Sequence, residues 1–381
     1  MRVLHLHSGN LYGGVESFLA TLVREEKWAP GMHTSIALCF EGRFSAELAA
    51  LGRAPHLLGE VRLSRPHTIR RARAALRELL RQEPADAIVC HQPWALLVFG
   101  SVVRALGYPV TLWLHMAGDG RHWLERAARF TALDAVMCNS RFSQGRAAGW
   151  LPRVPAQVVY YPVSPPALRE GGARRALRHR LGVDDERPVI VMAARAEPWK
   201  GHRVLVDACA RLSGQTNWSC WLVGGAQRDT EIAYVTELRR RIEETGLAAR
   251  VQLLGSRDDA REVIAAADIY CQPNLEPEPF GLSLVEAMYA GLPVVTSAAG
   301  GALEIVDETC GVLTRPGDVD AVSDALGQLI ADAPRRDRLG LSGRRRATTL
   351  CAPELQLPHI ERVLASAMRH ALHAEEGRRA G

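Results

Sequence analysis

The sequence predicts an α/β protein with two doubly wound parallel sheets, each in its own domain. Short apolar runs typical of buried strands alternate with amphipathic helical stretches, which is the order that builds a parallel sheet. The alternation stops at the proline-rich stretch 161–166, which reads as a linker, and then starts again. With 381 residues, the chain is long enough for two sizeable cores.

The first half supplies the elements of one sheet. Apolar runs predict strands at 3–6, 34–40, 87–90, 110–114 and 135–138, and helical periodicity predicts helices at 15–24 and 67–82. We expect this domain to span residues 1–163.

The second half repeats the pattern. Apolar runs predict strands at 189–192, 218–223, 251–254, 269–271 and 294–296. We expect the second domain at 164–352, followed by a helix over about 354–374 in a segment 353–381 that crosses the hinge. Two such halves imply a cleft between them, with ligands at the carboxyl ends of the strands.

Charge is uneven along the chain. Residues 1–165 hold 19 Lys and Arg against 12 Asp and Glu, whereas the remainder holds 28 against 30, so the basic excess lies in the first half. In the helix at 67–82, one face carries Arg70, Arg73, Arg77 and Arg81. This face fits either an anionic membrane or acceptor, or an ordinary solvated helix.

The composition also indicates the compartment. The N-terminus runs directly into a predicted strand, and no apolar run approaches the ~20 residues of a membrane helix. The eight cysteines form no C-x-x-C pair and mostly end or lie within apolar runs, as buried thiols do in a reducing compartment. We therefore expect a cytoplasmic protein, with contact at the inner face of the plasma membrane left open.

The stretch from Glu278 to Glu286 carries the strongest signal for function. Prolines keep the loop around Glu278 from becoming helical, Gly281 allows a turn, and 282–288 reads as a helix. The backbone N–H groups at the start of this helix favour a bound anion. An acid, a glycine turn and a second acid one turn into the helix suit a sugar nucleotide.

Two cations follow the predicted strand at 189–192. Arg195 and Lys200 lie five residues apart and can converge on one diphosphate. Lys200 is one of only two lysines in a chain rich in arginine, which favours a specific role over an ordinary surface loop.

Three weaker signals remain. Gly13 and Gly14 fill the turn after the first strand, where a phosphate-binding loop belongs, although any tight turn favours glycine. His115 ends the strand at 110–114, and both a structural and a catalytic role stay open. Asp318 and Asp320 have the spacing of a metal pair, but N-capping of the following helix explains them better, so we expect no metal site.

Taken together, these motifs resemble those of the family 4 retaining glycosyltransferases, which have the GT-B fold. The family's E-x7-E element matches Glu278 and Glu286, and its G-R-x4-K-G element matches residues 194–201, with Ala194 in place of the first glycine. Other departures are Asn274 and Tyr289, which leave the charged groups intact.

The resemblance implies roles for these residues. Arg195, Lys200 and the backbone at Phe280, Gly281, Leu282 and Ser283 would bind the donor diphosphate. Glu286 would bind the ribose, and Glu278 the transferred sugar. From the first domain, the Gly13–Gly14 turn would approach the donor phosphates, and His115 would be a catalytic residue near the sugar and the acceptor. A UDP- or GDP-type donor, a glycan, lipid-linked or small-molecule acceptor, and no metal or other cofactor are implied, in bacterial cell-envelope polysaccharide, exopolysaccharide or glycolipid synthesis.

Other classes of protein fit less well. A GT-B sugar-nucleotide epimerase, which needs no acceptor, is the main alternative. A pyridoxal-phosphate phosphorylase would need Lys200 for a Schiff base, and a non-catalytic binding protein would not need the intact acids and cations. Nucleic-acid binding lacks aromatic residues between the arginines.

Overall fold

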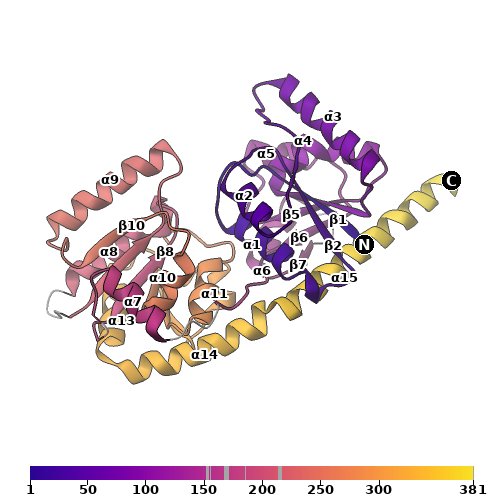
Figure 1. The fold of residues 1–381 in the computed structure, drawn as a ribbon. Helices are drawn as coiled ribbons and strands as arrows, with labels where there is room; N and C mark the ends of the chain where they lie inside the picture. Colours follow the sequence, from indigo (N-terminus) through magenta and orange to yellow (C-terminus); the bar gives the residue numbers. More distant parts are fainter. Residues whose placement is uncertain (152–153, 155, 167–170, 185, 213–216, 381) are drawn as a thin grey trace. The chain divides into compact units, whose positions relative to one another are not determined.

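The computed structural model describes the chain except residues 152–153, 155, 167–170, 185, 213–216 and 381. The chain divides into two compact units (Figure 1). Unit 1 comprises Met1–Ser164 and Cys351–Gly381, and unit 2 comprises Pro165–Leu350. Each unit is built on one parallel sheet, so the predicted fold class is confirmed.

Unit 1 contains a seven-stranded sheet in the order β3-β2-β1-β4-β5-β6-β7. The strands are β1 (Arg2–His7), β2 (His33–Leu38), β3 (His56–Leu57), β4 (Ala87–His91), β5 (Val110–Leu114), β6 (Ala135–Cys138) and β7 (Ala156–Val158). The helices between them are α1 (Gly14–Arg24), the short η1 (Glu26–Trp28), α2 (Arg43–Ala50), α3 (Pro66–Gln82), α4 (Gln92–Ala105), α5 (Trp123–Ala128) and α6 (Arg141–Ala148). The strand order reverses between β1 and β4, so the carboxyl ends of these two strands mark the switch point where such folds bind ligands.

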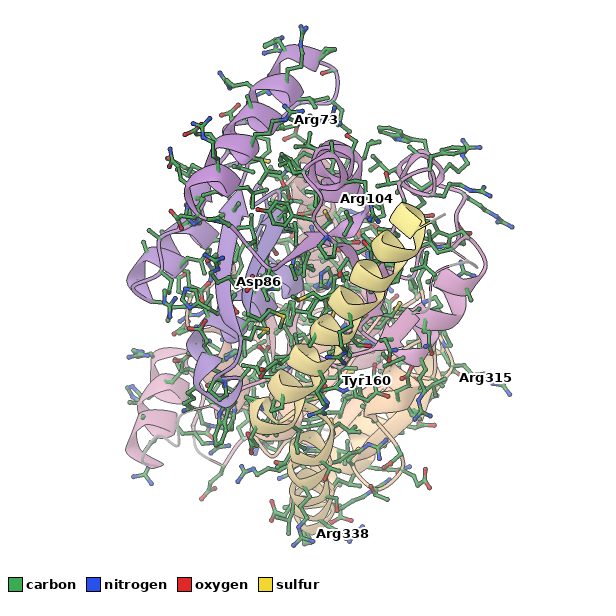
Figure 2. All side chains as sticks on the ribbon, turned by 90° about the vertical axis from the view of Figure 1, so that its right-hand side faces the viewer. Arg73, Asp86, Arg104, Tyr160, Arg315 and Arg338 are labelled. Atoms are coloured by element: carbon green, nitrogen blue, oxygen red, sulfur yellow. The ribbon has the colours of Figure 1, made fainter. Side chains whose placement is uncertain are left out.

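Helix α3 has the predicted apolar stripe, but one of its arginines does not face solvent. Arg73, which is labelled in Figure 2, is half-buried. Its guanidinium donates hydrogen bonds to the backbone oxygens of Val98 (2.6 Å) and Leu97 (3.2 Å) on α4. The prediction that Arg73 lies on the exposed face is therefore wrong, because position 73 borders the apolar stripe that packs against α4. Arg70, Arg77 and Arg81 are exposed as expected.

Unit 2 contains a six-stranded sheet in the order β10-β9-β8-β11-β12-β13. The strands are β8 (Val189–Ala193), β9 (Ser219–Val223), β10 (Val251–Gly255), β11 (Ile269–Gln272), β12 (Val294–Ser297) and β13 (Gly311–Thr314). The other elements are α7 (Gly171–Arg180), η2 (Pro198–Lys200), α8 (His202–Arg211), α9 (Asp229–Glu244), α10 (Ala260–Ala266), α11 (Leu282–Tyr289), α12 (Ala302–Ile305), α13 (Val319–Ala331) and α14 (Ala333–Cys351). Here the switch point lies between β8 and β11, and the loops that follow these strands carry the predicted donor-binding residues.

The last helix, α15 (Pro353–Ala380), returns the chain to unit 1. Its apolar side chains Leu357, Ile360 and Leu364 are fully buried. His359 Nε2 lies 3.1 Å from the backbone oxygen of Val158, which ends β7. Among the described residues, no helix combines the length and the apolar character needed to cross a membrane.

Candidate active site

Lys200 and Glu278 meet in unit 2. Lys200 Nζ lies 2.7 Å from Glu278 Oε2, and both side chains are largely buried. Lys200 ends η2, after β8, and Glu278 lies in the loop between β11 and α11. Because β8 and β11 are neighbours in the sheet, their carboxyl ends bring together two groups that are 78 residues apart in the sequence.

Glu278 is held by further polar side chains on one side only. Its Oε2 also accepts hydrogen bonds from Asn274 Nδ2 (2.9 Å) and Gln272 Nε2 (3.1 Å). The amide oxygen of Gln272 accepts in turn from Tyr270 and Ser283. Within the described part of the chain, Glu278 Oε1 has no partner, and it is not among the fully buried unpaired atoms. One carboxylate oxygen is thus fixed, while the other is available to a ligand.

Close backbone approaches hold the two loops in place. Gly201 has a φ of +82°, and a Cβ at this position would lie 1.9 Å from the backbone oxygen of Pro273. A Cβ on Gly300 would lie 2.4 Å from the backbone oxygen of Glu278. Only glycine permits these contacts without a shift of the backbone.

The N-terminus of α11 follows Glu278 directly. Gly281 adopts a φ of +97° and serves as the N-cap. In the described structure, the backbone N–H groups of Gly281, Leu282 and Ser283 have no acceptor, while Leu284 N donates back to Gly281 O. The predicted loop, turn and helix are therefore present, and the first turn offers free donors for an anion.

Arg195 has two carboxylate partners that the sequence did not reveal. Its Nη2 lies 2.9 Å from Glu197 Oε2, and its Nη1 lies 3.5 Å from Glu231 Oε1 on α9. The guanidinium is about one-third exposed. Arg195 and Lys200 thus follow the same strand but have different carboxylate partners.

Glu286 also has an unforeseen partner. Its Oε1 accepts a hydrogen bond from Arg261 Nε on α10 at 2.8 Å. The ion pair fixes the carboxylate one turn into α11, near the loop that carries Glu278.

In unit 1, the Gly13–Gly14 turn follows β1 and opens α1. Glu16 accepts a hydrogen bond from Gly13 N (2.8 Å) and contacts His7 Nε2 (2.6 Å), and Glu16 is buried. The N–H of Gly13 therefore already has an acceptor in the Glu16 carboxylate. The spacing of three residues that places Glu16 at this position is the capping-box pattern.

His115 lies at the end of a chain of buried rings. His5 Nδ1 lies 2.8 Å from His91 Nε2, and His91 Nδ1 lies 2.7 Å from His115 Nε2. His115 Nδ1 contacts the hydroxyl of Tyr161, so both ring nitrogens are engaged. Burial, followed by the charges of His7 and His5, holds the pKa of His115 well below its usual range. His115 is therefore neutral in this structure.

The last predicted feature is the pair Asp318 and Asp320, for which capping and metal binding were compared. Asp318 accepts a hydrogen bond from Ala321 N at 2.9 Å and caps α13, so the capping interpretation is confirmed. Asp320 pairs instead with Arg211 at 3.0 Å. Among the residues placed by the structure, no group of three His, Cys, Asp or Glu side chains could hold a metal.

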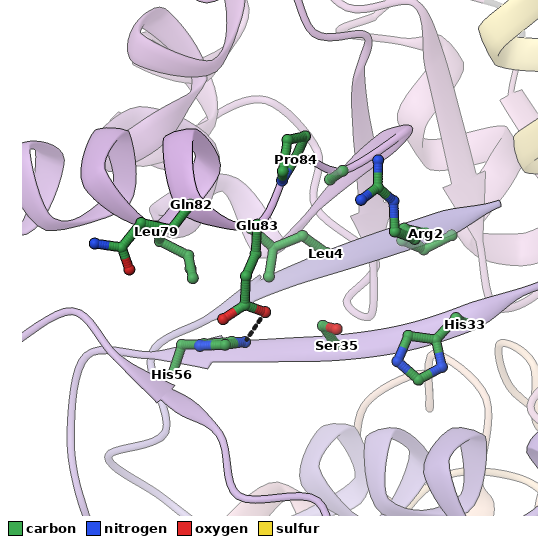
Figure 3. Close-up of a pocket in the computed structure, with 11 residues that line it drawn as sticks. Arg2, Leu4, His33, Ser35, His56, Leu79, Gln82, Glu83 and Pro84 are labelled. Carbon is green, nitrogen blue, oxygen red and sulfur yellow. Dashed lines mark ion pairs between the residues drawn. The ribbon is translucent and has the colours of Figure 1, made fainter.

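A cavity of about 270 Å³ lies away from these groups, at the amino ends of β1, β2 and β3 (Figure 3). Arg2, His33, His56 and Glu83 line it, and His56 Nε2 lies 3.7 Å from Glu83 Oε2. The cavity therefore lies at the amino ends of the strands, whereas the Gly13–Gly14 turn follows the carboxyl end of β1.

Family comparisons match both units. The family described as Glycosyltransferase Family 4 matches residues 12–165, and that described as Glycosyl transferases group 1 matches residues 173–346. The chain belongs to the family 4 glycosyltransferases.

Individual relatives agree with this assignment. The lipopolysaccharide core biosynthesis glycosyltransferase LpsE of Rhizobium meliloti (strain 1021) is 27% identical over 350 residues, 90% of this chain and 93% of the relative. A GDP-mannose-dependent monoacylated alpha-(1-6)-phosphatidylinositol monomannoside mannosyltransferase of Corynebacterium glutamicum is 30% identical over 51% of this chain and 52% of its own length. The chain spans about half the length of most of the curated relatives it matches.

A solved structure agrees as well. Anabaena Alr3699/HepE in complex with UDP-glucose has a TM-score of 0.84 and 26% identity, covering 96% of this chain and all of that one. The fold of this glycosyltransferase is therefore GT-B, and the comparisons do not support the epimerase alternative.

Sequence reasoning missed the partners that orient the predicted residues. Gln272 carried a usable signal, because it is a polar residue at the carboxyl end of a buried strand, where ligands bind in such folds. Arg261 and Glu231 carried none, since each comes from a separate helix and contacts the site only in the folded structure.

Proposed function

We propose that this glycosyltransferase moves a sugar from a UDP- or GDP-linked donor to an acceptor hydroxyl, with retention of configuration and without a metal cofactor. The observation that carries the proposal is the buried pair of Lys200 and Glu278 directly before the free N–H groups of α11. A cation and a helix N-terminus suit a diphosphate, and the accessible Glu278 Oε1 suits a sugar hydroxyl.

The donor is divided among the groups of unit 2. Lys200, Arg195 and the backbone from Phe280 to Ser283 bind the diphosphate. Glu286 accepts hydrogen bonds from the ribose hydroxyls, and Glu278 binds the transferred sugar. From unit 1, the Gly13–Gly14 turn would contact the donor phosphates, and His115, which follows β5, would lie near the transferred sugar and the acceptor.

Bond cleavage places charge where these groups can stabilise it. The bond between the anomeric carbon and the phosphate oxygen breaks, and both electrons leave with the diphosphate. The acceptor oxygen bonds to the same face of the sugar, and its proton passes to the leaving phosphate oxygen. Lys200, Arg195 and the α11 dipole neutralise the charge that develops on the diphosphate, which is the task a metal ion would otherwise perform.

The comparisons support the substrate class. HepE is solved with UDP-glucose, and curated relatives are named for GDP-mannose and for lipopolysaccharide core synthesis. We therefore propose a cytoplasmic enzyme of cell-envelope polysaccharide, exopolysaccharide or glycolipid synthesis. The exposed arginines Arg70, Arg77 and Arg81 on α3 would face an anionic membrane.

The test is product analysis with UDP-glucose and GDP-mannose as donors and membrane extract as acceptor. We expect release of the nucleoside diphosphate only when acceptor is present, an α-linked product by NMR, and full activity in a chelator. A β-linked product would contradict retention, and loss of activity that added magnesium restores would contradict metal independence.

A further inference from the structure

Helix α5 exposes aromatic residues that a water-facing helix normally buries. Trp123 is 51% exposed and Phe130 is 87% exposed. Phe130 lies just past the end of α5, where Phe130 N and Thr131 N still donate to Ala127 O and Ala128 O and continue the turn. Trp123 and Phe130 are seven residues apart, so they lie on the same face of this turn.

A buried carboxylate fixes this orientation. Glu125 is buried, and its Oε2 accepts a hydrogen bond from Gly120 N at 2.7 Å. Gly118 leaves room for it, because a Cβ there would lie 2.0 Å from Glu125 Oε1. Since Glu125 and Ala128 face the protein, the aromatic residues must face outward.

Arginines surround the aromatic residues. Arg121, Arg126 and Arg129 are exposed. Arg121 contacts Asp119 at 3.5 Å, whereas Arg126 and Arg129 make no ion pair with any residue the structure describes. The surface formed by Arg121, Trp123, Arg126, Arg129 and Phe130, here called the α5 surface, is therefore both apolar and cationic.

We propose that the α5 surface is a docking site for an anionic lipid bilayer, with Trp123 and Phe130 inserted at the interface and the arginines at the headgroups. Tryptophan and arginine suit this boundary, because each has an apolar part and a polar end. A second copy of the chain fits poorly, since a two-fold contact would bring the arginines together. The exposed arginines of α3 could attract an anionic bilayer by charge only, whereas the α5 surface also supplies apolar side chains that can insert into it.

The test is co-sedimentation of the full chain, without substrates, with phosphatidylcholine vesicles and with mixed phosphatidylcholine–phosphatidylglycerol vesicles. Wild type is expected to bind the mixed vesicles. The pair Trp123→Ser and Phe130→Ser should weaken binding at least about a hundredfold, the loss expected for two buried aromatic side chains. The pair Arg126→Gln and Arg129→Gln should weaken it about fivefold per arginine. Ile232→Ser and Arg239→Gln, exposed positions on α9, are the matched controls and should change nothing.

Insertion is measured separately by quenching of tryptophan fluorescence with brominated lipids. Trp123→Phe keeps the apolar contact, so binding should persist while the quenching falls. Unchanged vesicle binding in the aromatic pair would overturn the proposal. The proposal would also be overturned if the wild-type chain did not bind vesicles but formed a dimer, and if the double substitution of Trp123 and Phe130 abolished that dimer. Because no donor or acceptor is present, these outcomes are independent of glycosyl transfer.

Discussion

At the scale of single residues, the histidine chain of unit 1 shows how burial fixes chemistry. Burial lowers the pKa of His5 to about 3, and it holds the pKa of His91 and His115 well below the usual value. Each ring therefore carries one N–H, and the hydrogen bonds along the chain must all run in the same direction. Asn139 Nδ2 donates to the Tyr161 oxygen at 3.2 Å, so the hydroxyl at the end of the chain is itself held in place.

These depressed pKa values predict a loss of stability in acid. The unfolded chain binds a proton at His5 near pH 6.5, whereas the folded chain does so only near pH 3. The free energy of unfolding should therefore fall as the pH drops through this window, by about 1.4 kcal/mol per pH unit for each such histidine. Denaturant unfolding of unit 1 at several pH values measures this slope. His5→Leu should reduce this slope by the contribution of one histidine, and His67→Leu, at an exposed position at the start of α3, is the control and should leave the slope unchanged. Equal slopes in wild type and His5→Leu would contradict the assignment.

The residues that sequence alone identified are those whose type is unusual for their position. Lys200 stood out in an arginine-rich chain, and Glu278 stood out beside two prolines and a glycine turn. The prediction for Arg73 was wrong, because the face of α3 that contacts α4 depends on packing and not on the periodicity of α3 alone. Arg261 and Tyr161 could not be found, since their contacts form only when distant segments fold together.

At the scale of elements, glycines position the loops of the donor site. Gly201 and Gly246 both have positive φ, but only Gly201 approaches another backbone closely. Alanine at either position should destabilise the protein by about 1 kcal/mol, because the left-handed backbone strains a residue that has a Cβ. Only the change at Gly201 should move η2 away from Pro273.

This comparison gives a matched pair of variants. Gly201→Ala should weaken donor binding at least about tenfold, because Lys200 follows η2 out of position, and a tenfold loss corresponds to a small displacement energy of about 1.4 kcal/mol. Gly246→Ala should bind donor normally. Calorimetric titration with a UDP- or GDP-sugar measures both. Normal binding by Gly201→Ala would show that η2 does not position Lys200.

Sequence patterns identified the strands in the centre of each sheet, but they missed the short edge strands β3, β7 and β13 and also the long helices α4, α9 and α14. The strands in the centre of each sheet are buried on both faces and gave clear apolar runs. The edge strands β3, β7 and β13 have only two to four residues, which is too short for a periodic signal.

At the scale of the whole molecule, the two units have similar sheets but differ in their charged residues. Unit 1 holds the basic excess, the histidine chain and the α5 surface, while unit 2 holds the acids and cations assigned to the donor. The doubly wound architecture could be predicted because it follows from the repeated order of strands and helices. Which side chains meet at each switch point could not, since that depends on strand neighbours such as β8 and β11.

The central claim is that unit 2 binds a sugar nucleotide through its diphosphate, with Lys200 and Arg195 as the cations. It is tested most directly by the turnover of Lys200→Ala and Arg195→Ala beside Arg203→Ala, a control on the exposed face of α8. Thermal unfolding of each variant confirms that it is folded. The account predicts that each site variant loses about 10²–10³ in turnover, the usual effect of removing one stabilising donor, while Arg203→Ala stays near wild type. Folded Lys200→Ala and Arg195→Ala enzymes with wild-type turnover would contradict it.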